Sequence, residues 1–260
     1  MSRVAKRDRF CAFERIILGL KWGKVAITYL SMGEIRVIVQ SLETVTLVGA
    51  GLATIAEIAR CEALGPTLVA ADGGAAHCLA ADRMPDAVIG DMDSLGALAA
   101  QGIASERLHA IPEQDSTDFD KALRNITAPL VLGVGFCGAR MDHQLACYNV
   151  LVRQPHKRCV LLGDTDVVFL APPNLKLDLQ PGTRVSLFPL GLVEGVSDGL
   201  KWPIAGLNFT PDGRIGTSNA ALGPVEISVT GPKLLVILPR SELENVVQAL
   251  LATPGAWPAL

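Results

Sequence analysis

The sequence predicts an α/β unit, built on a parallel sheet with helices on both faces, followed by a smaller all-β sandwich. Through the first two thirds of the chain, short apolar runs alternate with helix-length segments, which is typical of a parallel sheet buried on both sides. After the Pro172-Pro173 pair, short alternating segments are separated by Gly, Pro and Asn, as in small sandwiches. Half of the 260 residues are apolar and only 19% are charged, so the chain can bury a sizeable core.

Six apolar runs are expected to form the strands of the first unit: residues 44–48, 67–71, 87–91, 108–111, 130–134 and 158–162. Helices are expected between them. Thr54 is placed to cap one, which Gly65-Pro66 ends, and another is predicted from Arg140 to Val152.

The second unit is predicted to contain five strands: residues 175–179, 184–190, 200–204, 225–229 and 234–238. Ser241 to Glu244 reads as a capping box that opens a helix through Leu251. We therefore expect an N-terminal extension (1–42), an α/β domain (43–172) and a β-sandwich with a C-terminal helix (173–260). Residues 1–31 are basic and interrupted by Glu14, which argues against a signal peptide, and our hypothesis is that Met32 is the natural start.

Composition excludes several classes of function. A net charge of −3 and a pI near 5.8, without a basic stripe, argue against nucleic acid as a partner. No apolar run reaches the roughly 18 residues of a membrane span. The six cysteines show no paired short spacing, so a zinc site or a disulfide framework is not expected and a reducing cytoplasm fits.

The stretch from Gly90 to Lys121 carries the main functional signal. Asp91 and Asp93 follow an apolar run and, two residues apart on extended chain, point the same way, which favours binding of a hard divalent cation. If Asp115, Ser116 or Thr117 caps the next helix, Asp118 and Lys121 share a face of its first turn, where a polyphosphate finds free N–H groups. The alternative is that these aspartates only cap helices and turns, and that Lys121 is an exposed helix lysine.

Several polar segments are expected at one edge of the sheet. Ligands of such sheets bind beyond the carboxyl ends of the strands, where Asp72, Asp91, Asp93, the 114–121 segment and the 135–142 turn would meet. Residues 49–51 lack the third glycine of a dinucleotide-binding fingerprint and are interpreted as a tight turn.

Six motifs occur in an order that closely resembles thiamine pyrophosphokinases: Ala71 to Ala75, Gly90 to Ser94, Gln114 to Lys121, Gly138 to His143, Gly199 to Pro203 and Thr217 to Asn219. The resemblance implies a Rossmann-like nucleotide-binding α/β domain, a thiamine-binding β-sandwich and a homodimer with active sites at the subunit boundary. The implied reaction is transfer of the pyrophosphoryl group of ATP to the hydroxyl of thiamine, giving thiamine diphosphate and AMP. Ala220-Ala221-Leu222 departs from the family pattern, in which an acidic and an aromatic residue are expected.

The resemblance also assigns roles to single residues. Asp91, Asp93 and Asp118 would hold Mg²⁺, with Asp93 or Asp118 accepting the hydroxyl proton, and Lys121 would offset phosphate charge. The residues implied for ATP are Asp72, Gly73, Gly74, Ser94 and Arg140. The residues implied for thiamine are Gln114, Thr117, Asp142 and, from the neighbouring subunit, Trp202, Ser218 and Asn219.

Some of these residues also have a purely structural interpretation, and other activities fit part of the motif set. A tryptophan in a β domain more often belongs to the core than to a ligand platform, and His143 is interpreted as structural. The alternatives to thiamine pyrophosphorylation are a pyrophosphokinase for another heterocyclic alcohol, such as a hydroxymethylpterin, and a non-catalytic nucleotide- or thiamine-binding module. A nucleotide-sugar transferase would use Asp-x-Asp for its metal but leaves the 114–121 and Trp202 motifs unexplained.

Overall fold

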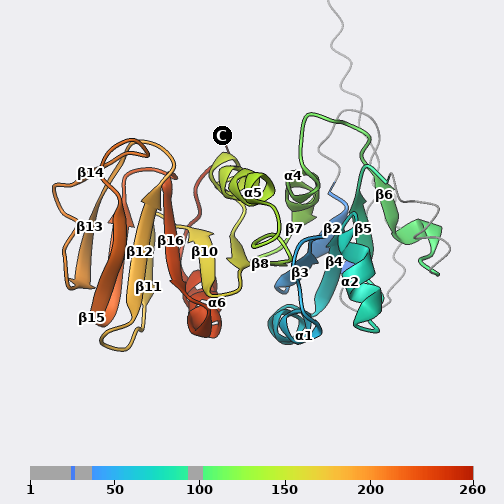
Figure 1. The fold of residues 1–260 in the computed structure, drawn as a ribbon, viewed down its shortest axis with the longest axis horizontal. Helices are drawn as coiled ribbons and strands as arrows, with labels where there is room; N and C mark the ends of the chain where they lie inside the picture. The colour runs from blue at the N-terminus through green and yellow to red at the C-terminus, as the bar shows by residue number, and fades with distance from the viewer. Residues whose placement is uncertain (1–24, 27–36, 93–101, 260) are drawn as a thin grey trace, which may run out of the picture.

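The computed structural model describes residues 25–26, 37–92 and 102–259. An α/β unit and a mostly β unit lie side by side along the long axis of the molecule (Figure 1). Asp93, Ser94, Met32 and Cys11 lie outside the described residues, so the structure does not test the expectations that rest on them.

The α/β unit contains two groups of parallel strands. In the first group β8 (Val131–Val134) lies between β3 (Val45–Val48) and β9 (Cys159–Leu162). In the second, β5 (Ala87–Gly90) lies between β4 (Thr67–Ala71) and β6 (Leu108–Ala110). We expected one continuous parallel sheet. Instead β3 and β4 are neighbours without a ladder, joined by an isolated antiparallel bridge between Val45 and Pro66. Proline offers no N–H to extend that bridge into a ladder.

Helices cover both sides of these strands. In Figure 1, α1 (Ile55–Leu64) and α2 (Gly74–Ala80) lie below them, and α4 (Asp118–Arg124) and α5 (Met141–Arg153) lie above. The predicted cap of α1 is confirmed: the Thr54 hydroxyl accepts from Glu57 N at 3.2 Å, and Glu57 accepts from Thr54 N at 2.8 Å. A small separate sheet, β1 (Val25–Ala26), β2 (Val39–Ser41) and β7 (Ile126–Thr127), was not predicted.

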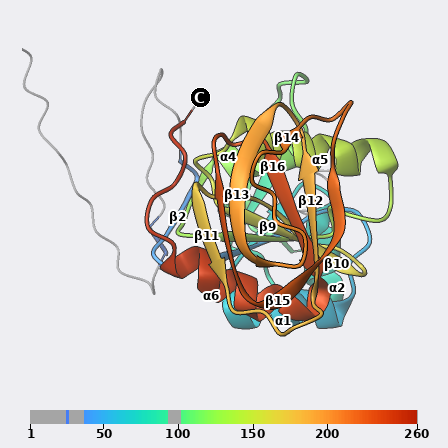
Figure 2. The ribbon, with the colours of Figure 1, turned by 90° about the vertical axis from the view of Figure 1, so that its left-hand side faces the viewer.

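The first parallel group continues without a break into the β unit. Strand β9 pairs antiparallel with β10 (Asp166–Leu170), which pairs with β16 (Leu234–Pro239), which pairs with β12 (Arg184–Pro189). The order from there is β15 (Gly216–Val229), β13 (Val193–Leu200) and β14 (Asn208–Phe209), and β11 (Asn174–Leu177) also pairs with β15. The long β15 pairs with β12 near its start and with β11 and β13 further on, so it connects two layers of strands. Figure 2 looks onto this unit, with α6 (Leu243–Ala252) beneath its strands.

Two local predictions in the β unit were wrong. The strand expected over residues 200–204 is in fact β13, which ends at Leu200, where the prediction began. The sequence of β13 contains two glycines and alternates small with charged residues, so it shows no apolar pattern that would predict a strand. The apolar residues Leu200 and Ile204, which suggested one, are buried at the end of β13 and in the turn that follows. The capping box at Ser241 does not form, because residues 240–242 make a 3₁₀ turn, η2, and α6 begins after it without a side-chain cap.

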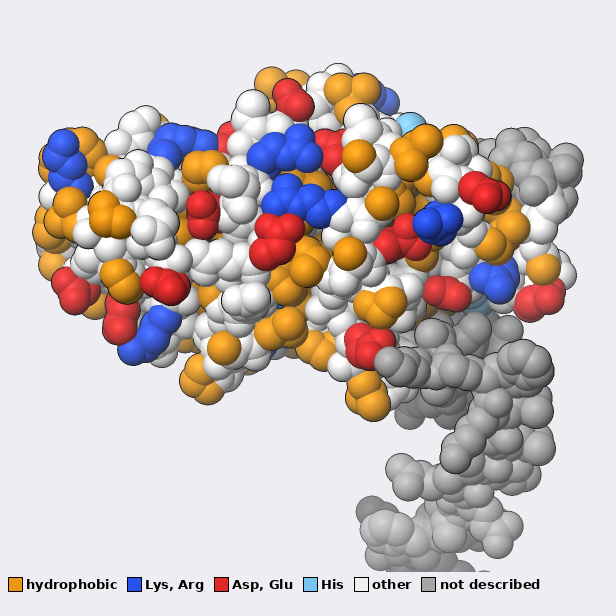
Figure 3. All heavy atoms as spheres, turned by 90° about the horizontal axis from the view of Figure 1, so that it is seen from below, with side chains coloured by type: hydrophobic (Ala, Val, Ile, Leu, Met, Phe, Trp, Pro, Cys, Tyr) orange, Lys and Arg blue, Asp and Glu red, His pale blue; other side chains and the backbone are white. Residues whose placement is uncertain are grey.

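The two units share a core and a polar joint. One apolar cluster contains residues of both units, among them Val48 and Leu187. On the face formed by α1 and α6, basic and acidic side chains lie next to one another (Figure 3). There the Arg60 guanidinium donates to both carboxylate oxygens of Glu244, at 2.8 and 2.6 Å, and Arg240 lies 3.1 Å from Glu57.

Five of the six cysteines lie among the described residues. Cys61, Cys78, Cys137, Cys147 and Cys159 are all buried free thiols. Among the described residues, no helix combines the length and the apolar character that crossing a bilayer requires.

Candidate active site

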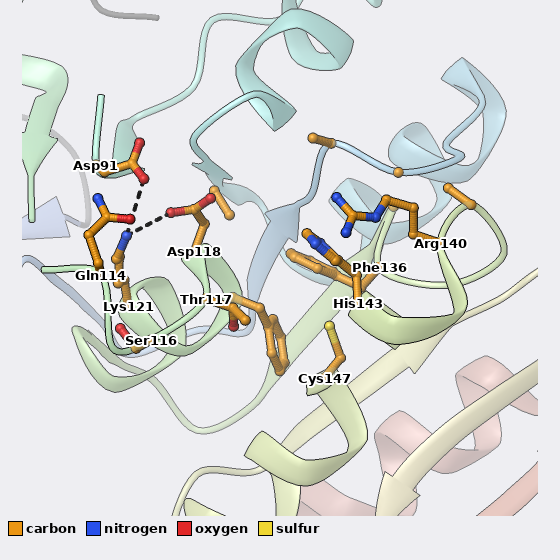
Figure 4. Close-up of a pocket in the computed structure, with 16 residues that line it drawn as sticks. Asp91, Gln114, Ser116, Thr117, Asp118, Lys121, Phe136, Arg140, His143 and Cys147 are labelled. Carbon is orange, nitrogen blue, oxygen red and sulfur yellow. Dashed lines mark hydrogen bonds and ion pairs between the residues drawn. The ribbon is translucent and has the colours of Figure 1, made fainter. Parts of the chain in front are cut away.

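A cavity of about 340 Å³ lies beyond the ends of β4, β5 and β8, between the first turns of α4 and α5. Its polar lining residues are Asp91, Gln114, Ser116, Thr117, Asp118, Lys121, Arg140 and His143. Figure 4 shows Lys121 with the carboxylates of Asp91 and Asp118 on one wall. Arg140 and His143 lie on the opposite wall. The structure thus brings together six of the residues predicted for the site: Asp91, Gln114, Thr117, Asp118, Lys121 and Arg140.

Local structure explains how the 114–121 segment enters the cavity. Thr117 is the N-cap of α4, and its hydroxyl accepts from Asp120 N at 3.3 Å. This confirms one of the three caps that the sequence left open. Asp118 is the first residue of the helix and Lys121 follows three positions later, so both project from the same face of its first turn.

Lys121 is the centre of the polar wall. Its side chain is only 2% exposed, so the alternative of an exposed helix lysine is wrong. The ammonium nitrogen lies 3.2 Å from Asp118 Oδ1 and 3.5 Å from Asp91 Oδ2. Burying an ammonium group is costly unless carboxylates compensate for its lost hydration, and here the end of β5 and the start of α4 each supply one.

The same two carboxylates are of the kind that binds a hard divalent cation. One oxygen of each lies within 3.5 Å of the same nitrogen, so the two carboxylates face a common point. Mg²⁺ is typically held by one or two carboxylates together with water and substrate phosphates, so a larger protein cluster is not required. No group of three metal-ligating side chains occurs in the part of the chain that the structure describes.

The glycines around the cavity serve backbone packing. A methyl group at Gly49 or Gly51 would lie 2.6 Å from the carbonyl oxygen of Gly135, itself at a φ of +80°. Gly51 N donates to that carbonyl at 2.8 Å. These contacts join two turns of the cavity wall and agree with the interpretation of residues 49–51 as a tight turn.

The segment of Asp72, Gly73 and Gly74 lies beside the cavity. Asp72 follows β4 with a φ of +38°, a region that residues other than glycine seldom adopt. A methyl group at Gly74 would lie 2.0 Å from the carbonyl oxygen of Val48, so glycine is required where α2 meets β3. Strain at an aspartate at the end of a strand is a recurrent feature of binding sites.

Arg140 and Asp142 form an exposed ion pair at the mouth of the cavity. Arg140 Nη2 lies 2.6 Å from Asp142 Oδ2, and about two thirds of each side chain is exposed. The hydrogen bond from Arg140 lowers the pKa of the Asp142 carboxyl. Asp142 itself does not line the cavity, so in this structure it faces solvent and its arginine partner.

Sequence reasoning missed an apolar part of the wall, formed by Phe119, Phe136 and Cys147, and left His143 as structural although it lines the cavity. The rings of Phe119 and Phe136 have centroids 4.7 Å apart and are tilted. Burial raises the pKa of the Cys147 thiol to about 12, so this group stays neutral. The spacing of His143 and Cys147, four residues apart on a helix that starts at the sheet edge, was the signal that could have revealed this face.

The three residues predicted to bind thiamine from the β unit cluster away from this cavity. Asn219 is 7% exposed; its side-chain amide donates to Trp202 O at 2.7 Å, and its oxygen accepts from Trp202 N at 3.1 Å. Ser218 has a φ of +62°. Trp202 is 55% exposed, so the interpretation as a core tryptophan is wrong. Within one chain, none of the three lines the cavity that contains Lys121.

Fold and site together define a protein in which an α/β unit with a lysine–carboxylate cavity is joined, through a continuous sheet, to a β unit that presents a tryptophan. Two family models match the chain: "Thiamin pyrophosphokinase, catalytic domain" over residues 64–162 and "Thiamin pyrophosphokinase, vitamin B1 binding domain" over residues 174–234. The chain belongs to the thiamin pyrophosphokinase family, as its motifs indicated.

Curated relatives and solved structures agree with this placement. Thiamine pyrophosphokinase 1 of Arabidopsis thaliana is 30% identical over 52% of this chain and 58% of its own length, and thiamine pyrophosphokinase 1 of Oryza sativa subsp. japonica is 29% identical over the same shares. The match therefore spans 58% of these relatives. Thiamin pyrophosphokinase from Candida albicans has a TM-score of 0.63 at 16% identity, covering 76% of this chain and 89% of that one. The Geobacillus thermodenitrificans structure has a TM-score of 0.61 at 22% identity, with 75% and 97% covered. The fold is that of thiamin pyrophosphokinases.

Proposed function

We propose that this chain transfers the pyrophosphoryl group of ATP to the hydroxyl of thiamine, with Mg²⁺, giving thiamine diphosphate and AMP. The observation that carries the proposal is the buried Lys121, which lies between Asp91 and Asp118 in a cavity of the family's catalytic domain. The alternatives, a pterin pyrophosphokinase and a non-catalytic binding module, have no comparable support, because the matching domains are described as catalytic and vitamin B1-binding.

The polar wall would bind the polyphosphate of ATP. Lys121 supplies a buried positive charge, and Arg140 on the opposite wall supplies a planar group that suits phosphate oxygens. When phosphate oxygens enter, they become additional partners of Lys121, and Arg140 exchanges Asp142 for phosphate. The implied nucleotide contacts of Asp72, Gly73, Gly74 and Ser94 belong to this proposal.

Asp91 and Asp118 would hold Mg²⁺, together with Asp93, which lies outside the described residues. The ion would neutralise charge on the transferred phosphates. Gln114 and Thr117 line the cavity next to these carboxylates and would position the thiamine hydroxyl.

The chemistry needs little covalent help from the protein. The hydroxyl oxygen of thiamine forms a bond to the β-phosphorus, and the bond from that phosphorus to the oxygen shared with the α-phosphate breaks, releasing AMP. The hydroxyl proton passes to Asp118, which is 37% exposed and faces the cavity, or to Asp93.

A second copy of the chain would complete the thiamine site. Trp202, Ser218 and Asn219 lie in the β unit, and none of them lines the cavity of its own chain, so we propose a homodimer in which one copy presents them to the other's cavity. Lys201 Nζ lies 4.7 Å from the centroid of the Trp202 ring, which shows that this indole accepts a cation on its face. The cationic rings of thiamine suit the same surface.

We also propose that the chain divides into an extension and two domains at residues 42 and 172. We further propose that the protein is located in the cytoplasm. Five buried free thiols fit a reducing compartment. The continuous sheet means that the two units are parts of one body even if each binds its own substrate.

The direct test is to incubate the full chain with Mg-ATP and thiamine and to measure AMP and thiamine diphosphate. We expect equal amounts of both products, and none without Mg²⁺. ATP consumption without thiamine diphosphate, or faster turnover of a hydroxymethylpterin than of thiamine, would overturn the proposal. The Asp118→Asn variant controls for a contaminating activity.

A further inference from the structure

A second cavity, of about 780 Å³, lies on the other side of α4 from the candidate active site. Helix α4 contributes to both: Asp118 and Lys121 line the first cavity, whereas Asp120 and Arg124 line the second. The remaining walls of the second cavity come from residues 37–38 before β2, from β6 and β7 with their neighbours, and from the end of α5 with the turn that follows it. Nothing in the proposed reaction uses this space.

The lining of the second cavity is rich in basic and imidazole side chains. Its members of this kind are His109, Arg124, Arg153, His156 and Lys157. Asp120 is the only carboxylate residue among the residues that line it. Arg124 already pairs with Glu113, whose Oε1 lies 2.7 Å from Arg124 Nη2, so the positive charge that the cavity can offer an anion is that of Arg153 and Lys157.

The single carboxylate is already satisfied. Asp120 is 3% exposed, and Gln154 Nε2 donates to its Oδ1 from the end of α5. Arg153 Nη1 lies 3.4 Å from its other oxygen, and Arg153 remains 60% exposed. Asp120 thus only partly neutralises the Arg153 guanidinium, and the exposed side of that group can still contact an anion.

Lys157 has no such partner. Its ammonium group donates to the carbonyl oxygen of Ile126 at 2.6 Å, and no carboxylate of the described chain lies within ion-pair distance of it. Burial lowers the pKa of this lysine. A half-buried ammonium group bonded only to a neutral carbonyl gains stability when an anion arrives beside it.

We propose that this second cavity binds a small phosphate ester, whose phosphate contacts Lys157 and Arg153. Phosphate carries up to two negative charges and offers several acceptor oxygens, which match an ammonium and a guanidinium group that line the same cavity at and just after the end of α5. The cavity has room for the organic part of the ester beside the phosphate. Because α4 separates the two cavities, an anion here acts next to the helix that carries Asp118 and Lys121.

The test is a calorimetric titration of the full chain with ribose 5-phosphate, in the absence of ATP and thiamine. Lys157→Gln removes the charge but keeps a donor for the Ile126 carbonyl, and we expect it to weaken binding at least tenfold. Lys176→Gln is the matched control, because Lys176 is an exposed lysine of β11 paired with Glu226 at 2.6 Å, and we expect it to change binding less than twofold. Circular dichroism checks that each variant is folded.

Three outcomes would overturn the proposal. They are no heat of binding with ribose 5-phosphate at millimolar concentration, equal binding by Lys157→Gln and the control, and equal affinity for inorganic phosphate, which would exclude an ester. If Lys157→Gln does not fold, Arg153→Gln replaces it, since that side chain is mostly exposed and glutamine can still donate to Asp120. The titration does not depend on turnover, so its failure is distinct from failure of the pyrophosphokinase proposal.

Discussion

The ammonium nitrogen of Lys121 lies 3.5 Å from a carboxylate oxygen of Asp91, which joins the start of α4 to the end of β5. The sequence placed both residues at one edge of the sheet, but it did not indicate that they touch. The contact makes the lysine and the carboxylates one electrostatic unit, and changes to any member are expected to affect the others.

Asp118→Asn should reduce thiamine diphosphate formation at least 100-fold, because it removes a proposed metal ligand and proton acceptor. The side chain is 37% exposed, so the change in unfolding free energy should stay within about 1 kcal/mol. Steady-state kinetics and urea unfolding check both parts. Asp115→Asn, in the same segment but outside the cavity, is the control and should retain near-normal activity.

Lys121→Met should also abolish turnover, with a larger loss in kcat than in the apparent affinity for thiamine. The methionine fills the buried space but removes the positive charge that lies 3.5 Å from Asp91 and 3.2 Å from Asp118. We therefore expect excess Mg²⁺ to stabilise the variant more than the unchanged protein, as measured by Tm. An active Lys121→Met variant would remove the central element of the proposed site.

Trp202→Ala should raise the KM for thiamine about tenfold and leave the KM for ATP within twofold, because aromatic stacking on a cation contributes on the order of 1 kcal/mol or more. The exposed indole makes a large loss of stability unexpected. At thiamine concentrations well below the raised KM, mixing this variant with Asp118→Asn should give more activity than the sum of the two variants, because one site of a mixed dimer is then intact. Activity no higher than the sum of the two variants would contradict a site shared between copies.

Arg60→Met should lower the unfolding free energy by about 1 kcal/mol at neutral pH, because it removes the bidentate ion pair with Glu244 that connects α1 of the α/β unit to α6 of the β unit. The hydrogen bond from Arg60 holds the pKa of Glu244 below its usual range. The contribution of the pair is therefore present above the unfolded pKa, about 4.3, and is lost as pH falls through the lower folded value. Urea unfolding at several pH values should show the difference between the two proteins disappearing in acid. Arg83→Met, which breaks a pair between α1 and the 82–83 turn only, is the control within one unit.

Thiol reagents should leave the folded protein active near pH 8. Burial raises the pKa of Cys147, which lines the cavity, to about 12, so almost no reactive thiolate exists at that pH. Iodoacetamide followed by mass spectrometry should label Cys147 only after denaturant is added. Rapid labelling of this residue in the native state, with loss of activity, would show that the cavity wall opens.

Local chemistry explains which parts of the fold the sequence predicted. Thr54 was predicted as a cap and Thr117 as one of three candidate caps, because a capping side chain and its target lie three residues apart. The failures concern features set by distant contacts. Strand β13 is held by β15 across the unit and lacks an apolar alternation of its own. The 3₁₀ turn that replaces the expected Ser241 cap starts at Arg240, whose N donates to the distant Thr165 O at 2.9 Å.

The site was predictable to the same degree. Motifs identified Asp91, Asp118 and Lys121, but the burial of Lys121 follows from packing of α4 against β5, which no local pattern encodes. The apolar wall at Phe119 and Phe136 was missed because two separate segments create it. Trp202 lies two residues after the end of β13, and the conformation of that turn, not the residue type, determines that the side chain is exposed.

The ladder from β8 through β9 and β10 to β16 runs across the junction without a hinge residue between the two units. A bend there would break several backbone hydrogen bonds at once, so the indole cannot swing toward the lysine of its own chain. For the proposed homodimer we therefore expect separation into single chains to abolish the proposed activity while the fold persists, so that specific activity should fall as protein concentration is lowered.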